Sequence, residues 1–280
     1  MARVSLTLRR QAASILRMEF KQADELVKIL KASRADLQAK LEANPGNWSY
    51  RQYETVINQH VADLETRLAN GLNTGNLMEA GRRFGHELAG ESASVPRSSA
   101  FWEPLPALPL EALALENSRY VELIRGLTDD HKTIAFRQLK ISLSQGEGIT
   151  ETMDRLLGTG LQGLQGRDGV FRTSRTRAEV IGRTVANDLV NRGALSSYQE
   201  LDGYYPEMGL QKMWMTTSDN RTSDRCASLI GQIRDLSEDF EASDGWRGQN
   251  PPSHPQCRSR VVSISKKYKA EWALDRRQLA

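Results

Sequence analysis

The run Trp214-Met-Thr-Thr-Ser-Asp219-Asn-Arg221-Thr222-Ser-Asp-Arg-Cys226 is followed, after a polar stretch, by Pro251-Pro252-Ser-His254-Pro255-Gln-Cys257-Arg258-Ser-Arg260-Val-Val. These two segments hold both cysteines of the chain and one of its four histidines. Apolar residues before the Asp-Asn pair predict a strand near 213–216, and the pair itself favours a turn because short polar side chains bond their own backbone. The β-branched run after Cys257 predicts a second strand over 260–264. A third strand is expected near 232–233.

A short helix that carries Cys226, Leu229 and Ile230 is expected between the first two strands, with Thr222 or Ser223 as its N-cap. The prolines around His254 fix φ at three of five positions and favour extended conformations in the residues before them. We therefore expect His254 and Cys257 to be presented on a rigid segment.

The order of these motifs resembles the phage head morphogenesis domain of Mu F-like minor head proteins. Members of that family carry a tryptophan-led strand, an Asp-x-Arg-Thr turn followed by a cysteine, and a closing Pro-Pro-x-His-Pro-x-Cys-Arg motif. The matching residues here are Trp214, Asp219, Arg221, Thr222, Cys226, Pro251, Pro252, His254, Pro255, Cys257 and Arg258. The resemblance covers roughly the C-terminal half and extends upstream through Ile181-Gly-Arg183-Thr184. Many members end in Cys-Arg-Cys, whereas Ser259 stands at the last position here.

The resemblance implies a structural protein of the virion, located in the capsid interior or at the portal vertex and assembled in the host cytoplasm. It implies a role in capsid assembly and in DNA packaging or ejection. The expected partners are the portal protein, packaged viral DNA and other head proteins. No apolar run approaches the roughly 18–20 residues of a membrane span, so no membrane partner is expected. The motif is then a fold signature, with no catalytic residue and no cofactor.

Cys226, His254 and Cys257 admit four interpretations. They supply three ligands of types that suit zinc, although a closed tetrahedral site needs a fourth. A Cys226–Cys257 disulfide would close a loop of about 32 residues and contribute about 3–4 kcal/mol, but a reducing cytosol opposes it. A catalytic Cys–His pair needs a base oriented by a third group, and no motif marks a substrate pocket. The fourth interpretation, reduced thiols packed beside a hydrogen-bonded His254, is the one that a structural role favours.

The predicted fold class is α+β: predominantly helical, with a small C-terminal β-sheet subdomain that carries the two motifs. The chain has 280 residues, of which 39% are hydrophobic and 6% aromatic, and its mean hydropathy is −0.53. This polar balance favours an extended helical protein with a large surface. The expected organisation is an N-terminal helical region (1–90), a Pro/Ser-rich linker (91–109), a helical middle region (110–205), the motif region (206–270) and a C-terminal tail (271–280).

Apolar residues at helical spacing predict a helix over 1–43 and a second one over 50–68, which together form a helical hairpin. In the linker, Phe101 and Trp102 could contact a partner or their own protein's surface. Further along, Thr128 is expected to cap a new helix, and a capping-box match predicts that another helix opens at Thr176. Gly193 then marks a kink or a stop. The glycine-rich run 158–169 matches no phosphate-binding motif and is taken as a flexible connector.

The segment 254–280 has a net charge of +5, from seven basic and two acidic residues, whereas the whole chain has only +3. Such a segment can neutralise DNA phosphates, dock on an acidic protein, or be a solvated end. The candidate contacts to DNA or a partner are Arg258, Arg260, Lys266, Lys267, Lys269, Arg276 and Arg277.

Two rival functions remain open from the sequence. The first is a metal- or thiol-dependent hydrolase or nuclease carried in the virion, which would use Cys226, His254 or Cys257. The second is a host-derived DNA-binding protein, for which the sequence offers no recognisable helix-turn-helix or zinc-finger motif.

Overall fold

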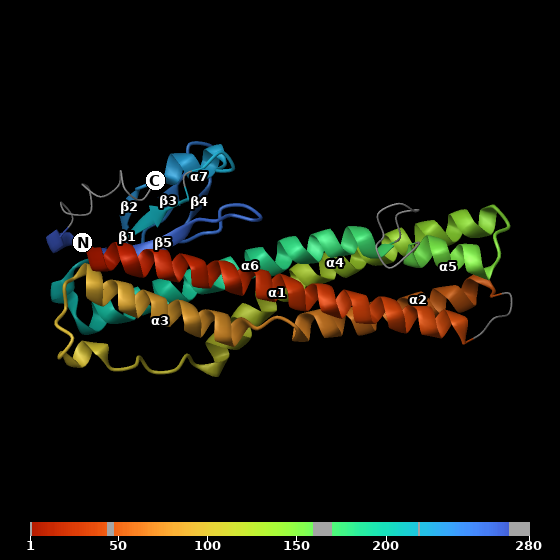
Figure 1. Cartoon of the computed structure of the whole chain (residues 1–280), viewed down its shortest axis with the longest axis horizontal. Coiled ribbons are helices and arrows are strands. Elements are labelled where there is room, and N and C mark those ends of the chain that lie inside the picture. The colour runs from red at the N-terminus through yellow and green to blue at the C-terminus, as the bar shows by residue number, and fades with distance from the viewer. Residues whose placement is uncertain (1, 44–47, 159–169, 218, 269–280) are drawn as a thin grey trace. The chain divides into compact units, whose positions relative to one another are not determined.

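The computed structural model describes residues 2–43, 48–158, 170–217 and 219–268. In chain order its helices and strands are α1 (Ala2–Glu42), α2 (Tyr50–Asn70), α3 (Thr74–Ser92), η1 (Ala100–Trp102), α4 (Leu110–Ser144), α5 (Ile149–Leu157), α6 (Val170–Tyr204), η2 (Pro206–Met208), β1 (Leu210–Met215), α7 (Asp224–Leu229), β2 (Ile233–Asp235), β3 (Phe240–Glu241), β4 (Arg247–Gly248), β5 (Arg260–Ser265) and η3 (Lys266–Tyr268). Long helices dominate, and the strands gather near the C-terminal end of the described chain (Figure 1). The predicted α+β class is confirmed.

The chain forms two compact units, and each is assembled from separate stretches. Unit 1 contains the residues up to Phe20, Thr74–Leu113 and the residues from Arg183 onward. Unit 2 contains Lys21–Asn73 and Ala114–Gly182. The long helices α1, α4 and α6 therefore each supply residues to both units. The segment 91–109, expected as a linker, lies within unit 1.

Unit 2 contains the predicted helical hairpin. Helix α2 begins at Tyr50 because Ser49 and Gln52 form a capping box, in which each side chain bonds the backbone of the other. The predicted apolar stripe is buried along most of its length, at Tyr53, Ile57, Val61, Leu64 and Leu68. Ion pairs Arg67–Asp36 and Lys40–Asp63 join α2 to the second half of α1. The hairpin prediction is confirmed.

The predicted helix start at Thr128 is wrong, because α4 runs through this residue without a break. The Thr128 side chain is fully buried, and its hydroxyl donates to the carbonyl of Ile124 one turn earlier, at 3.2 Å. A threonine whose hydroxyl is satisfied inside the helix does not have to cap one.

Helix α6 also begins earlier than predicted, at Val170 instead of Thr176. Val170 and Phe171 are buried, and their packing extends the helix beyond the local capping signal. Of the two alternatives expected at Gly193, a kink or a stop, the stop is wrong, because α6 continues to Tyr204. A Cβ atom at Gly193 would lie 2.1 Å from the carbonyl oxygen of Met78. This glycine is therefore explained by the close approach of α3 and α6 within unit 1.

The three-stranded sheet of unit 1 is antiparallel in the order β2-β1-β5, and β3 and β4 form a separate two-stranded ribbon. Both long strands and the third strand predicted near 232–233 are present. Lys212 of β1 lies opposite Arg234 of β2 and Ser263 of β5. Because side chains alternate along a strand, the residues of β1 contribute to both faces of the sheet.

Both faces of this sheet are covered. Met213, Val262 and Ile264 pack with Leu8 of α1 and Leu88 of α3. On the other face an apolar cluster gathers around the fully buried Trp214; its members include Tyr198, Leu210, Cys226, Leu229, Phe240, Cys257 and Val261. The two cysteines are thus part of the core that holds the sheet to α6.

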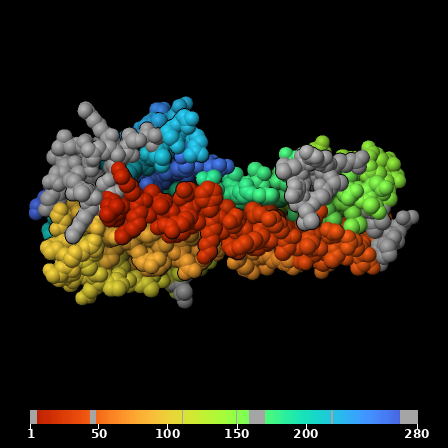
Figure 2. All heavy atoms as spheres, in the orientation of Figure 1, coloured from red at the N-terminus to blue at the C-terminus, as the bar shows by residue number. Residues whose placement is uncertain are grey.

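The segment after α3 lies on the surface of its own unit (Figure 2). The Phe101 side chain is only 3% exposed, and its carbonyl oxygen lies 2.6 Å from Nε2 of His86. The indole N–H of Trp102 donates to the carbonyl of Pro96 at 2.9 Å, and the Arg97 guanidinium lies 3.9 Å from the centre of a Trp102 ring. Phe101 and Trp102 could have contacted a partner or their own protein, and the structure shows that they contact their own protein.

Among the described residues, no helix has the length and apolar character that crossing a membrane requires. The predicted connector 158–169 falls almost wholly outside the described residues, as do the tail 271–280 and the basic residues Lys269, Arg276 and Arg277.

Candidate functional site

Helix α7 places Cys226 in its first turn. Ser223 is the N-cap, as one of the two predicted alternatives, and its Oγ accepts a hydrogen bond from the Cys226 backbone N–H at 3.2 Å. The Cys226 side chain is 2% exposed. The local sequence therefore fixes the direction in which this thiol enters the core.

The closing segment brings His254 and Cys257 to the same point. Sγ of Cys226 lies 3.2 Å from Nε2 of His254 and 3.6 Å from Sγ of Cys257. The other ring nitrogen of His254, Nδ1, lies 2.8 Å from the carbonyl oxygen of Pro255. Because a carbonyl can only accept, Nδ1 carries the proton, and in the neutral imidazole the Nε2 lone pair faces the thiol and the Ser223 hydroxyl.

Hydroxyl groups surround the Cys226 sulfur. Oγ of Ser253 lies 3.4 Å from it, and the Ser259 hydroxyl donates to it at 3.3 Å. Ser259 is in turn 2.7 Å from Oγ1 of Thr216, which accepts the indole N–H of Trp214 at 3.0 Å. A continuous hydrogen-bonded chain thus joins the tryptophan of the first strand to the thiol.

These contacts shift the pKa values of the two thiols in opposite directions. The pKa of Cys226 is lowered to about 4, chiefly because the Cys257 thiol donates to its sulfur, with further hydrogen bonds from serine hydroxyls. The pKa of Cys257 is raised, by the neighbouring Cys226 sulfur and by burial. Cys226 is therefore the more acidic thiol of the pair. Both cysteines are free, because the sulfur atoms are far beyond the roughly 2.05 Å of a disulfide.

A second cluster ties the turn after β1 to the closing segment. The Arg258 guanidinium makes a bidentate pair with the Asp219 carboxylate, at 2.5 and 2.7 Å, and these hydrogen bonds lower the Asp219 pKa. The backbone N–H of Arg221 donates to the same carboxylate at 3.0 Å, and the Thr222 hydroxyl donates to the carbonyl of Thr217 at 2.6 Å. The four polar motif residues predicted from the sequence therefore lie together and shape the turn.

Arg225 holds the proline-containing segment against α7. No pattern in the sequence predicted this role. The Arg225 guanidinium donates to the carbonyl of Ser253 at 2.6 Å and to the Asp244 carboxylate at 2.7 Å. Pro251 is buried, whereas Pro252 is half-buried and Pro255 is exposed. The serine hydroxyls at 253 and 259 were also missed, although both stand inside or beside the closing motif.

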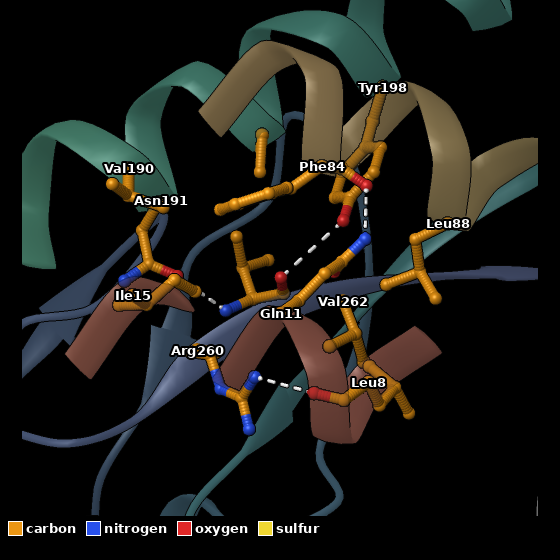
Figure 3. A pocket seen from close by; sticks show the side chains of 12 residues that line it. Leu8, Gln11, Ile15, Phe84, Leu88, Val190, Asn191, Tyr198, Arg260 and Val262 are labelled. Atoms are coloured by element: carbon orange, nitrogen blue, oxygen red, sulfur yellow. Dashed lines mark hydrogen bonds between the residues drawn. The ribbon is translucent and has the colours of Figure 1, made fainter. Parts of the chain in front are cut away.

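The basic candidates for DNA contact differ in their surroundings. Arg260 is nearly buried, donates to the carbonyl of Leu8 at 3.2 Å, and has its pKa lowered to about 10 by that burial. It borders a cavity of about 20 Å³, into which Gln11 also extends on its way to the Phe84 carbonyl (Figure 3). A space of that size holds about one water molecule and no substrate.

Lys266 and Lys267 are exposed, and Lys266 lies 3.3 Å from Asp235.

A comparison of the sequence with protein families matches the region that contains this site. Residues 136–262 match the family described as phage Mu protein F like protein. This part of the chain is similar to the phage Mu F-like family. The matched stretch includes the turn, both cysteines and the complete closing motif, so the resemblance seen in those residues is confirmed. Comparisons with curated proteins and with solved structures gave no match.

The Mu F-like match supports a role in phage head morphogenesis. The core location of Cys226 and Cys257, and the use of Asp219 and Arg258 to close a turn, are what a fold signature requires. The arrangement of His254 and the two sulfur atoms has a further chemical capacity, considered below.

Proposed function

We propose that this Mu F-like chain is a minor head protein that associates with the portal and acts by binding, without catalysis. The observation that carries the proposal is the family match over 136–262, which contains the whole motif region up to β5. In this proposal the chain takes part in capsid assembly and in DNA packaging or ejection, and it resides in the virion at the capsid interior or portal vertex.

The surroundings of the candidate catalytic groups support binding over catalysis. Cys226 and Cys257 are each 2% exposed, so a substrate has no direct access to either sulfur in this conformation. The small cavity beside Arg260 and the open pocket beside Gly209 are lined by other residues. Asp219, Arg221 and Thr222 form hydrogen bonds that stabilise the turn itself.

Contact with packaged DNA is assigned to the exposed end of the basic segment. Arg258 and Arg260 are engaged by Asp219 and by the carbonyl of Leu8, so neither guanidinium is presented to a phosphate backbone. Lys266 and Lys267 are exposed, and the sequence that follows them is basic. Lysines of this kind bind phosphates through charge, in a manner that depends on salt and not on sequence.

A protein partner could use the exposed apolar residues of α1 in unit 1. Leu16 and Phe20 are four residues apart, on one side of the helix, and are 45% and 52% exposed. We propose this surface as a contact with the portal or with a second head protein.

Particle composition tests the proposal. Heads assembled with and without the gene for this chain would be purified and analysed by quantitative mass spectrometry and electron microscopy. We expect the chain in DNA-filled heads at far fewer copies than the major capsid protein, and fewer filled heads when the gene is absent. Normal filled heads that lack the chain would overturn the proposal.

The alternative, a thiol-dependent hydrolase, is favoured by one observation: the lowered pKa of Cys226 beside His254. It requires that Cys226 react in the native protein. Native chain and denatured chain would be treated with iodoacetamide and mapped by mass spectrometry. Modification of Cys226 only after unfolding supports the structural role, whereas rapid native modification supports the hydrolase.

A further inference from the structure

We propose that Cys226, His254 and Cys257 form a binding site for a zinc-type divalent cation, which pins helix α7 to the closing segment. The inference is independent of portal binding. The ligand atoms of these three residues all lie within 4.8 Å of one another. They come from two segments that meet only in the folded chain, so a bound cation would cross-link α7 to the segment before β5.

The distances between the ligand atoms fit a tetrahedral metal. With Zn–S near 2.3 Å and Zn–N near 2.0–2.1 Å, two sulfur ligands lie about 3.8 Å apart, and a sulfur and a nitrogen about 3.6 Å apart. The observed separations are 3.6 Å between the sulfur atoms and 3.2 Å between Cys226 Sγ and His254 Nε2. These two pairs need shifts of only a few tenths of an ångström, whereas the third pair, His254 Nε2 and Cys257 Sγ, lies within 4.8 Å and closes to about 3.6 Å when the cation binds.

The imidazole is already oriented as a ligand. In zinc sites a ligating histidine commonly donates its other N–H to a carbonyl or carboxylate, which fixes the tautomer and the ring orientation. His254 does so through Nδ1, towards the carbonyl of Pro255 at 2.8 Å. This leaves Nε2 pointing at the Cys226 sulfur.

The sulfur atoms also have supporting contacts of their own. The backbone N–H of Ser259 lies 3.5 Å from Sγ of Cys257, and hydroxyls of Ser253 and Ser259 approach Sγ of Cys226. Two thiolates and one imidazole make a ligand set that suits zinc over hard cations such as Mg²⁺. His254 is half-buried and not enclosed, so a cation can enter from its side.

The fourth coordination position falls to water or to the hydroxyl of Ser259. Ser259 Oγ is 3.3 Å from Sγ of Cys226, within the range of one tetrahedral edge. Replacing this hydroxyl by a thiol would therefore supply a third sulfur ligand without moving the backbone. The substitution Ser259→Cys therefore tests the proposal by adding a ligand.

Metal binding would be measured on the full-length chain, reduced and freed of metal with a chelator. Zinc content after dialysis against zinc chloride is determined by mass spectrometry of the intact protein. Cobalt(II) then serves as a spectroscopic probe of sulfur ligation. We expect one zinc per chain, tetrahedral cobalt bands with thiolate-to-cobalt charge transfer, and loss of both in Cys257→Ser and His254→Gln.

Ser259→Cys separates a metal site from a folding effect, because it adds a ligand. We expect this variant to show stronger thiolate-to-cobalt charge transfer and slower release of zinc to a chromogenic chelator than the unmodified chain. The control is Ser237→Cys, which adds a thiol at an exposed position outside the cluster. It should match the unmodified chain in both measurements.

Three outcomes would overturn the inference. The first is a reduced and folded chain that takes up no zinc. The second is a cobalt spectrum that Cys257→Ser leaves unchanged while circular dichroism shows the variant to be folded. The third is equal zinc retention by Ser259→Cys, Ser237→Cys and the unmodified chain.

Discussion

Ser223 has two contacts at the start of α7. Its Oγ accepts the Cys226 backbone N–H and lies 2.9 Å from Nε2 of His254. Removing an N-cap hydroxyl leaves a helix N–H without its partner and costs about 1 kcal/mol. We therefore expect Ser223→Ala to lower the free energy of unfolding by about that amount, measured by urea titration. Ser237→Ala, at an exposed position with no such contact, should change it little; equal losses would contradict the capping role.

His60 and His131 are buried in unit 2 with their ring centres 5.4 Å apart. Burial lowers their pKa values to about 4 and about 3, from 6.5. Between pH 6.5 and 4 the unfolded chain thus binds protons that the folded chain does not. Stability contributed by the neutral rings is complete above pH 6.5 and is lost as the pH falls.

The corresponding experiment compares the unmodified chain with His131→Asn in urea titrations at several pH values from 7 to 4. We expect the unmodified chain to lose more stability over this range than the variant does. Parallel losses would show that the buried histidine pair does not contribute to acid sensitivity.

Sequence alone predicted the motif residues but not their polar surroundings. Trp214, Cys226, His254 and Cys257 were found because their order matched a family. The hydroxyl chain through Thr216 and Ser259 was not found, because it forms only when segments more than forty positions apart meet. Arg260 was expected at a partner surface, yet it points towards Leu8; the charge of a residue does not reveal what packs over it.

At the scale of elements, the packing of α3 on α6 depends on glycine. A Cβ atom at Gly193 would lie 2.1 Å from the Met78 carbonyl, whereas at Gly203, near the end of the same helix, it would meet nothing within 4 Å. Gly193→Ala should therefore lower the free energy of unfolding by about 1–3 kcal/mol, as overpacking does. Gly203→Ala should leave it unchanged or raise it by up to about 1 kcal/mol, since alanine favours helix.

Thermal and urea unfolding of these two variants decides the point. Similar stability for Gly193→Ala and Gly203→Ala would mean that the backbones of α3 and α6 can separate at little cost, contrary to the packing described.

The errors in predicted helix boundaries share one cause. Capping signals at Thr128 and Thr176 are local, whereas Thr128 is buried inside α4 and the buried Val170 and Phe171 extend α6 before Thr176. The start of α2 was predicted from its apolar stripe, and the structure adds a capping box between Ser49 and Gln52 at that point. Strands were easier to predict, because β1 and β5 are short, strongly apolar and bounded by turn residues.

At the scale of the whole molecule, composition could not have predicted the two compact units. Each unit joins stretches separated by dozens of residues, and α1, α4 and α6 divide their residues between the two. Helical periodicity identifies which face of a helix is buried but not which distant helix covers it. The family match likewise begins at residue 136, inside α4, and includes residues of both units.

Association with the portal is the central claim, and sedimentation velocity tests it most directly. The full-length chain, in zinc-loaded and chelator-treated forms, would be mixed with assembled portal rings from the same genome at physiological salt. We predict that the chain migrates with the ring and that a portion of the free-chain boundary disappears. A chain that sediments at its own rate in both forms, at every portal concentration tested, would contradict the account.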